Sequence, residues 1–118
     1  MPNLEVYLKD TSVGALVELL VSELNTDAVK IYSDEIVEIF SFGDIRVTIT
    51  LGVEDSYSSL YMVGSRIWKS DLELAHFISK SLNTTVRCDP GNNYPKVNPH
   101  SDIFVEVYED KESLVNWI

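Results

Sequence analysis

The chain has 118 residues, of which 45% are hydrophobic, and its 19 Asp and Glu against 9 Lys and Arg give a formal net charge of -10. No two basic residues are adjacent, and phosphate-binding surfaces need clustered Lys and Arg, so the composition argues against nucleic-acid binding. The single cysteine cannot form an internal disulfide, and no run of about eighteen uncharged apolar residues occurs, so we expect a cytoplasmic protein with no membrane span.

The N-terminal part predicts a strand followed by a helix. Apolar and polar residues alternate over residues 4–9, the period of a half-buried strand. Over residues 13–24 apolar residues recur at steps of three and four, which predicts one apolar stripe on a helix. Ser12 or one of the two residues before it is expected to cap this helix, and Asn25 to end it.

The middle of the chain is predicted to hold short strands at residues 28–32, 36–42, 45–51 and 60–63. Gly43-Asp44 between the second and third of these indicates a tight hairpin, since Gly supplies the positive φ that such turns need. Residues 52–58 are predicted to form a polar, acidic loop that exposes Tyr57.

The C-terminal half begins with a second helix over residues 71–82, signalled by the capping box Ser70 and Glu73. Two strands, 85–88 and 103–108, then flank a long connection that holds three of the four prolines. The last ten residues fit either a final strand or a short helix. The whole of 1–118 is therefore expected to be one α+β domain, with a mostly antiparallel sheet of five to seven strands and two helices packed on one face.

A thiol hydrolase would need a nucleophile and a base, which Cys88 with His100 and Asp102 could supply. A nucleophilic thiol requires a lowered pKa, whereas Asp89 next to Cys88 opposes ionisation. We therefore interpret Cys88 as a core residue and expect no catalytic residue.

Metal ligands would be drawn from Asp89, His100 and Asp102, but their spacing matches no known ligand pattern. Isolated glycines leave no phosphate-cradling loop. We therefore expect no metal and no cofactor. His76 is predicted to lie in a surface charge cluster with Glu73 and Lys80.

The surplus carboxylates and one loop tyrosine are the residues that we expect to contact a partner. They are Asp34, Glu35, Glu54, Asp55, Tyr94, Asp102, Glu106, Glu109 and Asp110. Glu106 shares its strand face with Phe104 and Tyr108, which favours a binding surface provided that no helix covers that face.

In size, charge and element order the chain resembles the immunity proteins that neutralise bacterial toxins. The resemblance implies a one-to-one inhibitor of a toxin domain, often a basic nuclease, whose nucleic-acid-binding cleft is occupied by acidic residues. Charge complementarity would speed association with such a basic partner. The alternatives are a small hydrolase using Cys88 and His100, and a structural homodimer formed through exposed Phe40, Phe42 or Trp117. As an inhibitor the protein could be a monomer or a homodimer.

Overall fold

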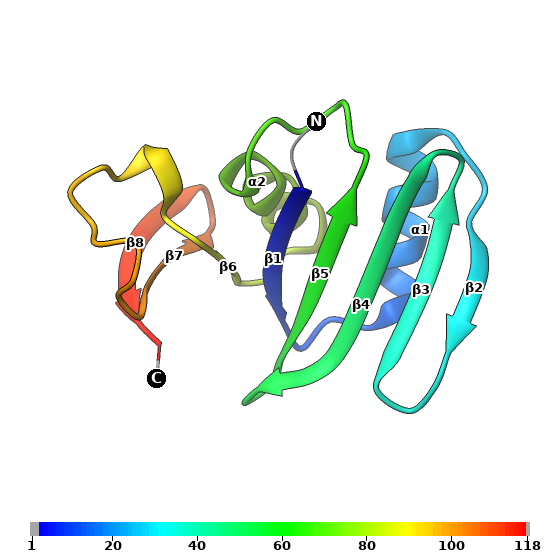
Figure 1. Ribbon diagram of the computed structural model, residues 1–118, viewed down its shortest axis with the longest axis horizontal. Coiled ribbons are helices and arrows are strands. Elements are labelled where there is room, and N and C mark those ends of the chain that lie inside the picture. The colour runs from blue at the N-terminus through cyan, green and yellow to red at the C-terminus, as the bar shows by residue number, and fades with distance from the viewer. Residues whose placement is uncertain (1–2, 118) are drawn as a thin grey trace.

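The computed structural model describes residues 3–117, which form an antiparallel sheet of eight strands with two α-helices (Figure 1). The strands are β1 (Asn3–Lys9), β2 (Val29–Ser33), β3 (Val37–Phe42), β4 (Ile45–Glu54), β5 (Tyr57–Val63), β6 (Val86–Cys88), β7 (Ile103–Tyr108) and β8 (Lys111–Asn116). The helices are α1 (Val13–Leu24) and α2 (Asp71–Leu82), and a 3-10 turn, η1, covers Gly91–Asn93. The α+β class is confirmed, and the strand number exceeds the predicted five to seven.

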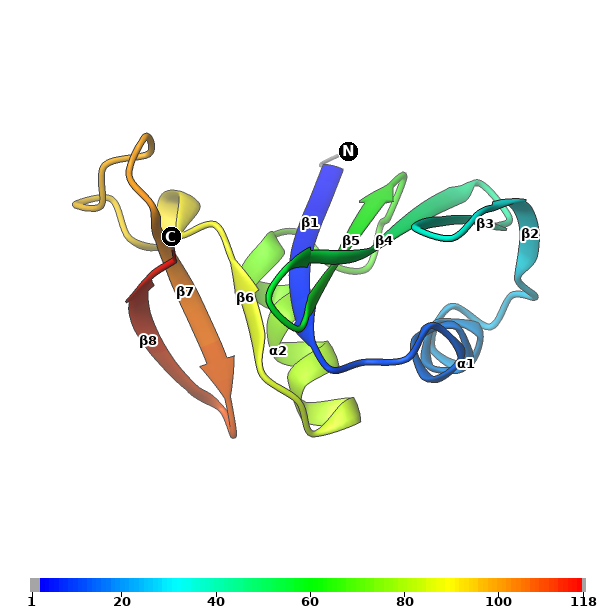
Figure 2. The same cartoon turned by 90° about the horizontal axis from the view of Figure 1, so that it is seen from below.

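The N-terminal strand lies in the middle of the sheet, whose order is β2-β3-β4-β5-β1-β6-β7-β8. β1 pairs with β5 on one side and with β6 on the other, through Val6–Leu60 and Leu8–Val86 among other pairs. It therefore joins two meanders, β2–β5 and β6–β8, which follow α1 and α2 in the chain. The sheet twists strongly, so that β7 and β8 run at a steep angle to β3 and β4 (Figures 1 and 2).

Both helices begin and end where the sequence predicts. Ser12 Oγ and Ser70 Oγ each accept the backbone N–H of the third residue after them, at 3.1 and 3.2 Å. Asn25 and Asn83 end the helices in the left-handed conformation, with φ of 50° and 51°. Neither of these two helices has the length and apolarity needed to cross a membrane.

The core lies between the helices and one face of the sheet. α1 contributes Leu16 and Leu20 to it, and α2 contributes Leu74 and Ile78, all of them at most 1% exposed. Each such side chain stabilises the fold by about 1.5–3 kcal/mol relative to an exposed one. The sheet contributes the alternate residues of its strands, which are Leu4, Val6, Leu8, Phe40, Phe42, Val47, Ile49, Leu60, Met62, Val86, Cys88, Val105 and Val107.

Two of the three side chains named in the homodimer hypothesis lie in this core. Phe40 and Phe42 are buried, because β3 is an inner strand whose alternate residues point toward α1. The remaining side chain of that hypothesis, Trp117, is half-buried on the opposite face of the sheet.

The prediction of a loop over residues 52–58 is wrong. β4 extends to Glu54 and β5 begins at Tyr57, so only Asp55 and Ser56 form the turn between them. Tyr57 is 4% exposed rather than exposed in a loop. Its ring packs on Trp117, with 4.9 Å between centroids. The C-terminal segment, for which a strand and a helix were both open, forms β8.

Candidate partner-binding surface

One face of the sheet is not covered by a helix, and we call it the open face. α2 contacts β1, β6 and β7 from the other side, and α1 lies on that same side behind β3 and β4 (Figures 1 and 2). The condition placed on Glu106 and Phe104, that no helix should cover their face, is therefore met. Residues along an antiparallel strand alternate between the two faces of the sheet, and those on the solvent face are usually polar. The open face instead carries many large apolar side chains.

Toward β1, β6, β7 and β8 the open face holds an aromatic cluster, made of Tyr7, Phe104 and Trp117 together with Tyr57 from the start of β5. The Trp117 ring lies 5.1 Å from Tyr7, 4.9 Å from Tyr57 and 5.2 Å from Phe104, measured between centroids. The indole N–H is buried with no hydrogen-bond partner among residues 3–117, so no hydrogen bond holds the side chain. Burial in this cluster raises the pKa of Tyr7 to about 12, with Glu5 adding to the shift.

An ion pair is built into the aromatic cluster. The Arg87 guanidinium carbon lies 4.7 Å from the Tyr57 ring centroid and 5.0 Å from that of Trp117. Arg87 Nε and Nη2 donate to Glu106 Oε1 at 3.1 and 2.9 Å. Glu106, predicted as a free acidic contact, is thus already neutralised by Arg87 from the neighbouring strand.

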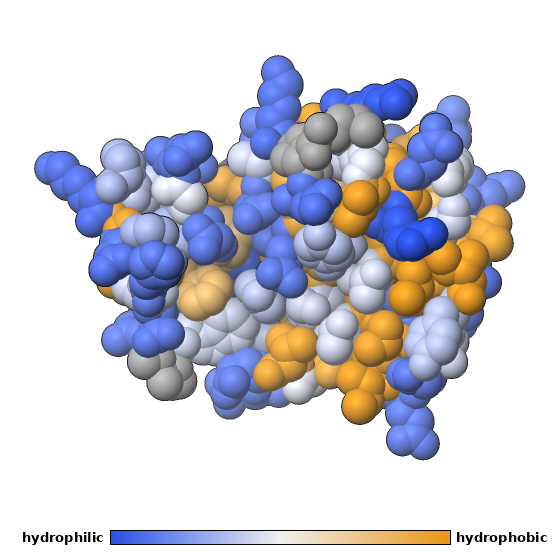
Figure 3. Space-filling model, in the orientation of Figure 1, coloured by the Kyte–Doolittle hydropathy of each residue, from blue (hydrophilic) through white to orange (hydrophobic). Residues whose placement is uncertain are grey.

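The β2–β5 part of the open face carries mostly aliphatic side chains, with Tyr61 among them. Val37 and Ile39 of β3 lie on the same face as Tyr61 and Val63 of β5, as the pairing register across β4 shows. Tyr61 is 36% exposed and Val63 is 37% exposed. Figure 3 looks onto this face and shows the hydrophobic residues, in orange, gathered at the right, where β2, β3 and β4 lie in Figure 1. Contiguous exposed apolar surface of this kind marks interaction sites in soluble proteins.

The open face is close to electrically neutral although the chain is strongly acidic. Pairing registers place four basic side chains on it, Lys9, Arg46, Arg87 and Lys111. They place three acidic ones there, Glu5, Glu54 and Glu106. The surplus of carboxylates therefore lies outside the face, in turns, loops and helices. An apolar centre with charge at its periphery is the usual anatomy of a protein interface.

Three hairpin turns carry six of the predicted contact residues, and we call them the acidic turns. They are Asp34-Glu35 after β2, Glu54-Asp55 at the end of β4, and Glu109-Asp110 after β7. All three follow strands that run in the same direction, so topology puts them at one end of the strands. Twist separates them in space. The first two both lie at the lower edge in Figure 1, apart from each other, while the third points toward the helix side in Figure 2.

Asp34 stabilises the first acidic turn through hydrogen bonds to its own carboxylate. Its carboxylate accepts the backbone N–H groups of Ile36 and Val37 at 2.8 and 2.7 Å, and the Tyr32 hydroxyl at 2.6 Å. These hydrogen bonds, the one from Tyr32 foremost, lower the pKa of Asp34. Glu35, next to it, is exposed and is free for a partner.

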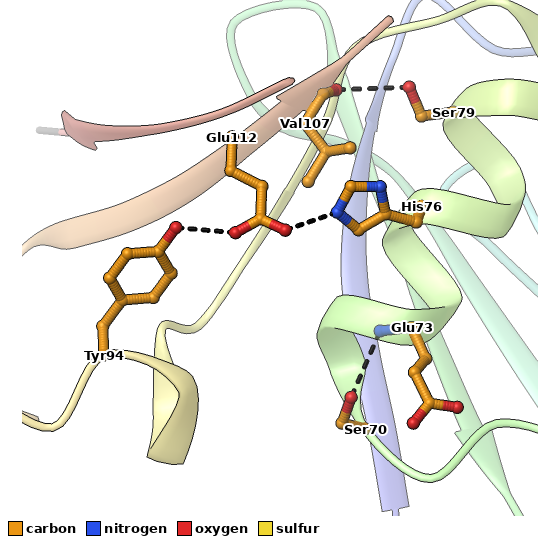
Figure 4. A network of polar contacts seen from close by, with 7 residues as sticks. All are labelled: Ser70, Glu73, His76, Ser79, Tyr94, Val107 and Glu112. Carbon is orange, nitrogen blue, oxygen red and sulfur yellow. Dashed lines mark hydrogen bonds and ion pairs between the residues drawn. The ribbon is translucent and has the colours of Figure 1, made fainter. Parts of the chain in front are cut away.

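The remaining predicted residues do not join the acidic turns. Asp102 precedes β7 and therefore lies at the opposite end of the strands from Glu109 and Asp110. The Tyr94 hydroxyl donates to Glu112 Oε1 at 2.6 Å, so this tyrosine is engaged within the molecule (Figure 4). The nine predicted residues thus form no single site.

A polar network on the helix side was missed by sequence reasoning. Glu112 of β8 accepts from Tyr94 through one oxygen and contacts His76 Nε2 of α2 at 2.6 Å through the other (Figure 4). It fastens the proline-containing loop and β8 to α2. The predicted pairing of His76 with Glu73 and Lys80 is not what the structure shows. No local spacing signals a contact between residues so far apart in the chain.

Cys88 lacks the properties of a nucleophile. It is fully buried in the core, as predicted, and burial raises the pKa of its thiol to about 12. A reactive thiol needs the opposite shift. The hydrolase hypothesis therefore loses the residue on which it depended. Within residues 3–117, no three His, Cys, Asp or Glu side chains are grouped so as to hold a metal ion.

Comparisons of the chain with protein-family models, with curated proteins and with solved structures find no match.

Proposed function

We propose that this protein is a protein-binding module that holds a basic partner protein against its open face. The observation that carries the proposal is the sheet face left uncovered by α1 and α2, which presents Tyr61, Val63 and an aromatic cluster instead of the polar residues usual on a wet face. Tyr and Trp are enriched where proteins bind one another.

The acidic turns attract a basic partner electrostatically and so raise the rate at which it reaches the open face. Charges at the rim of an interface mainly raise the association rate and make it salt-dependent, while the apolar centre holds the complex together. A net charge of -10 selects a partner of opposite sign. Capture of a basic toxin domain, the role of immunity proteins, is the specific activity that we propose.

A capture experiment with matched variants tests the proposal. Tyr61→Arg places a cation in the middle of the open face, beside Glu5, where it would repel a basic partner. Ile67→Arg makes the same charge change in the loop between β5 and α2, at a residue that is 46% exposed. Wild type and Ile67→Arg should retain a common basic protein from lysate, identified by mass spectrometry, and Tyr61→Arg should lose it. Equal retention by all three would refute the proposal.

A further inference from the structure

β2 is the outermost strand on the aliphatic side of the open face. All five of its residues are exposed, including Val29 at 58% and Ile31 at 49%. Only β3 pairs with it, so its outer row of backbone N–H and C=O groups has no strand partner within residues 3–117. An exposed apolar edge of this kind is a template for strand addition.

The devices that usually protect an edge are weak in β2. Lys30 is turned back onto the sheet, with Nζ 2.9 Å from Glu38 Oε1 and 5.7 Å from the Phe40 ring centroid. A bulge at Ile31, where the register passes from Lys30–Phe40 to Tyr32–Ile39, is the remaining protection. The opposite edge, β8, begins with two charged residues, and its Glu112 is engaged by Tyr94 and His76.

A second copy of the chain is a poor occupant of this edge. Asp27 and Glu35 each lie four residues from Ile31, on either side of it and two residues beyond the ends of β2. Two β2 strands paired antiparallel about Ile31 would therefore bring Asp27 of one copy toward Glu35 of the other at both ends. Like charges placed opposite each other destabilise a strand pair, and the net charge of -10 on each chain adds to the repulsion.

The same carboxylates complement a different strand. We propose that β2 accepts an extended segment of the basic partner as a ninth strand, with apolar residues at its centre and Lys or Arg toward its ends. The apolar centre would lie against Val29 and Ile31, and the basic ends against Asp27 and Glu35. This inference rests on the proposed function, since it assigns part of the same partner to the edge that borders the open face.

Selection from a displayed library of random peptides of about ten residues, the upper length of common strands, tests the inference. Ile31→Lys places a lysine on the edge, which natural proteins use against strand addition. Leu114→Lys is the control, because Leu114 is 47% exposed on the other edge strand and the charge change is identical. Peptides selected on the wild type should carry basic residues at both ends. They should bind Leu114→Lys unchanged and Ile31→Lys at least about tenfold more weakly.

Failure to select any peptide, or selection of peptides that bind Ile31→Lys as tightly as wild type, would overturn strand addition at β2. Enrichment of the protein's own β2 sequence would point to a second copy instead and would also overturn it. The Tyr61→Arg capture result does not depend on these peptides. Loss of capture there, combined with failure here, leaves the open-face function standing and removes only the added strand.

Discussion

Among single residues, Arg87 connects the packing of the open face with its charge. Its guanidinium lies over the rings of both Tyr57 and Trp117, while both of its hydrogen bonds go to Glu106. The ion pair therefore lies within the aromatic cluster, where the Arg87 side chain is only 18% exposed. Lysine could not replace arginine here, because an ammonium offers neither the planar stacking surface nor the forked donors.

Replacing Arg87 should be costlier than replacing the whole pair. Arg87→Leu leaves the Glu106 carboxylate half-buried without its partner, and should lower the free energy of unfolding by about 2 kcal/mol. The double variant Arg87→Leu with Glu106→Leu should recover more than about half of that loss, because no unpaired charge remains. Urea denaturation of wild type, Arg87→Leu, Glu106→Leu and the double variant measures this double-mutant cycle. Additive losses would show that the two residues are not energetically coupled.

Glu112 gives stability a defined dependence on pH. Hydrogen bonds from Tyr94 and then from His76 lower the pKa of Glu112 below its ordinary value of 4.5. A carboxyl group with a lowered pKa in the folded state contributes stability above its unfolded pKa, and the contribution is lost as pH falls through the folded value. Low pH should therefore loosen the attachment of β8 and the proline-containing loop to α2.

The variant Glu112→Gln should be less stable than wild type by about 1 kcal/mol at neutral pH, since the contact is partly solvated. Its deficit should shrink as pH falls below the ordinary carboxyl pKa of 4.5, where wild type begins to lose the ionised carboxylate. Thermal unfolding across a pH series measures the difference. Glu109→Gln, in an exposed turn, is the control and should show no comparable loss. A constant deficit at every pH would contradict the role assigned to the carboxylate.

At the scale of elements, the turn between β7 and β8 combines acidic side chains with an unfavourable backbone. Glu109 and Asp110 both have positive φ, 51° and 63°, which is the type I′ geometry that favours Asn-Gly. A left-handed conformation is uncommon for a residue such as Glu. The sequence of this turn is therefore not the one that stability alone would select.

Replacing Glu109-Asp110 by Asn-Gly should raise the free energy of unfolding by about 1 kcal/mol, because both new residues tolerate positive φ. Chemical denaturation measures the gain. Ala-Ala in the same two positions is the control, since it removes the same charges without relieving the backbone, and it should not stabilise. An equal gain from both pairs would attribute the effect to charge and not to φ.

Elements with local signals were predictable from the sequence, and elements defined by distant contacts were not. Ser12, Asn25, Ser70 and Asn83 mark the helix ends because capping depends on the residues beside the helix. β8 has no clear alternation, and pairing with β7 decides its conformation. The open face could not be predicted for the same reason, because it depends on contacts between segments that are distant in the chain. Arg87 meets Glu106, and Glu112 meets His76, only after strands distant in the chain have been placed side by side.

For the molecule as a whole, the separation of charge from the contact surface predicts how binding responds to salt. Glu54→Lys with Asp55→Asn removes charge from the acidic turn nearest the open face, and should slow association with the captured partner about tenfold at low ionic strength. Glu18→Lys with Glu23→Gln makes the same charge change on α1 and should slow it much less. Stopped-flow measurements across a salt series would show this, and an association rate insensitive to salt in wild type would refute steering.

The open face itself is tested most directly by hydroxyl-radical footprinting of the complex with the captured partner. Tyr61 and Tyr7 lie on the open face, and Phe77 of α2 lies on the helix side. Binding should protect the two tyrosines from oxidation and leave Phe77 unchanged. Protection of Phe77 with no change at Tyr61 would contradict the account, because the partner would then be bound to the helices and not to the sheet.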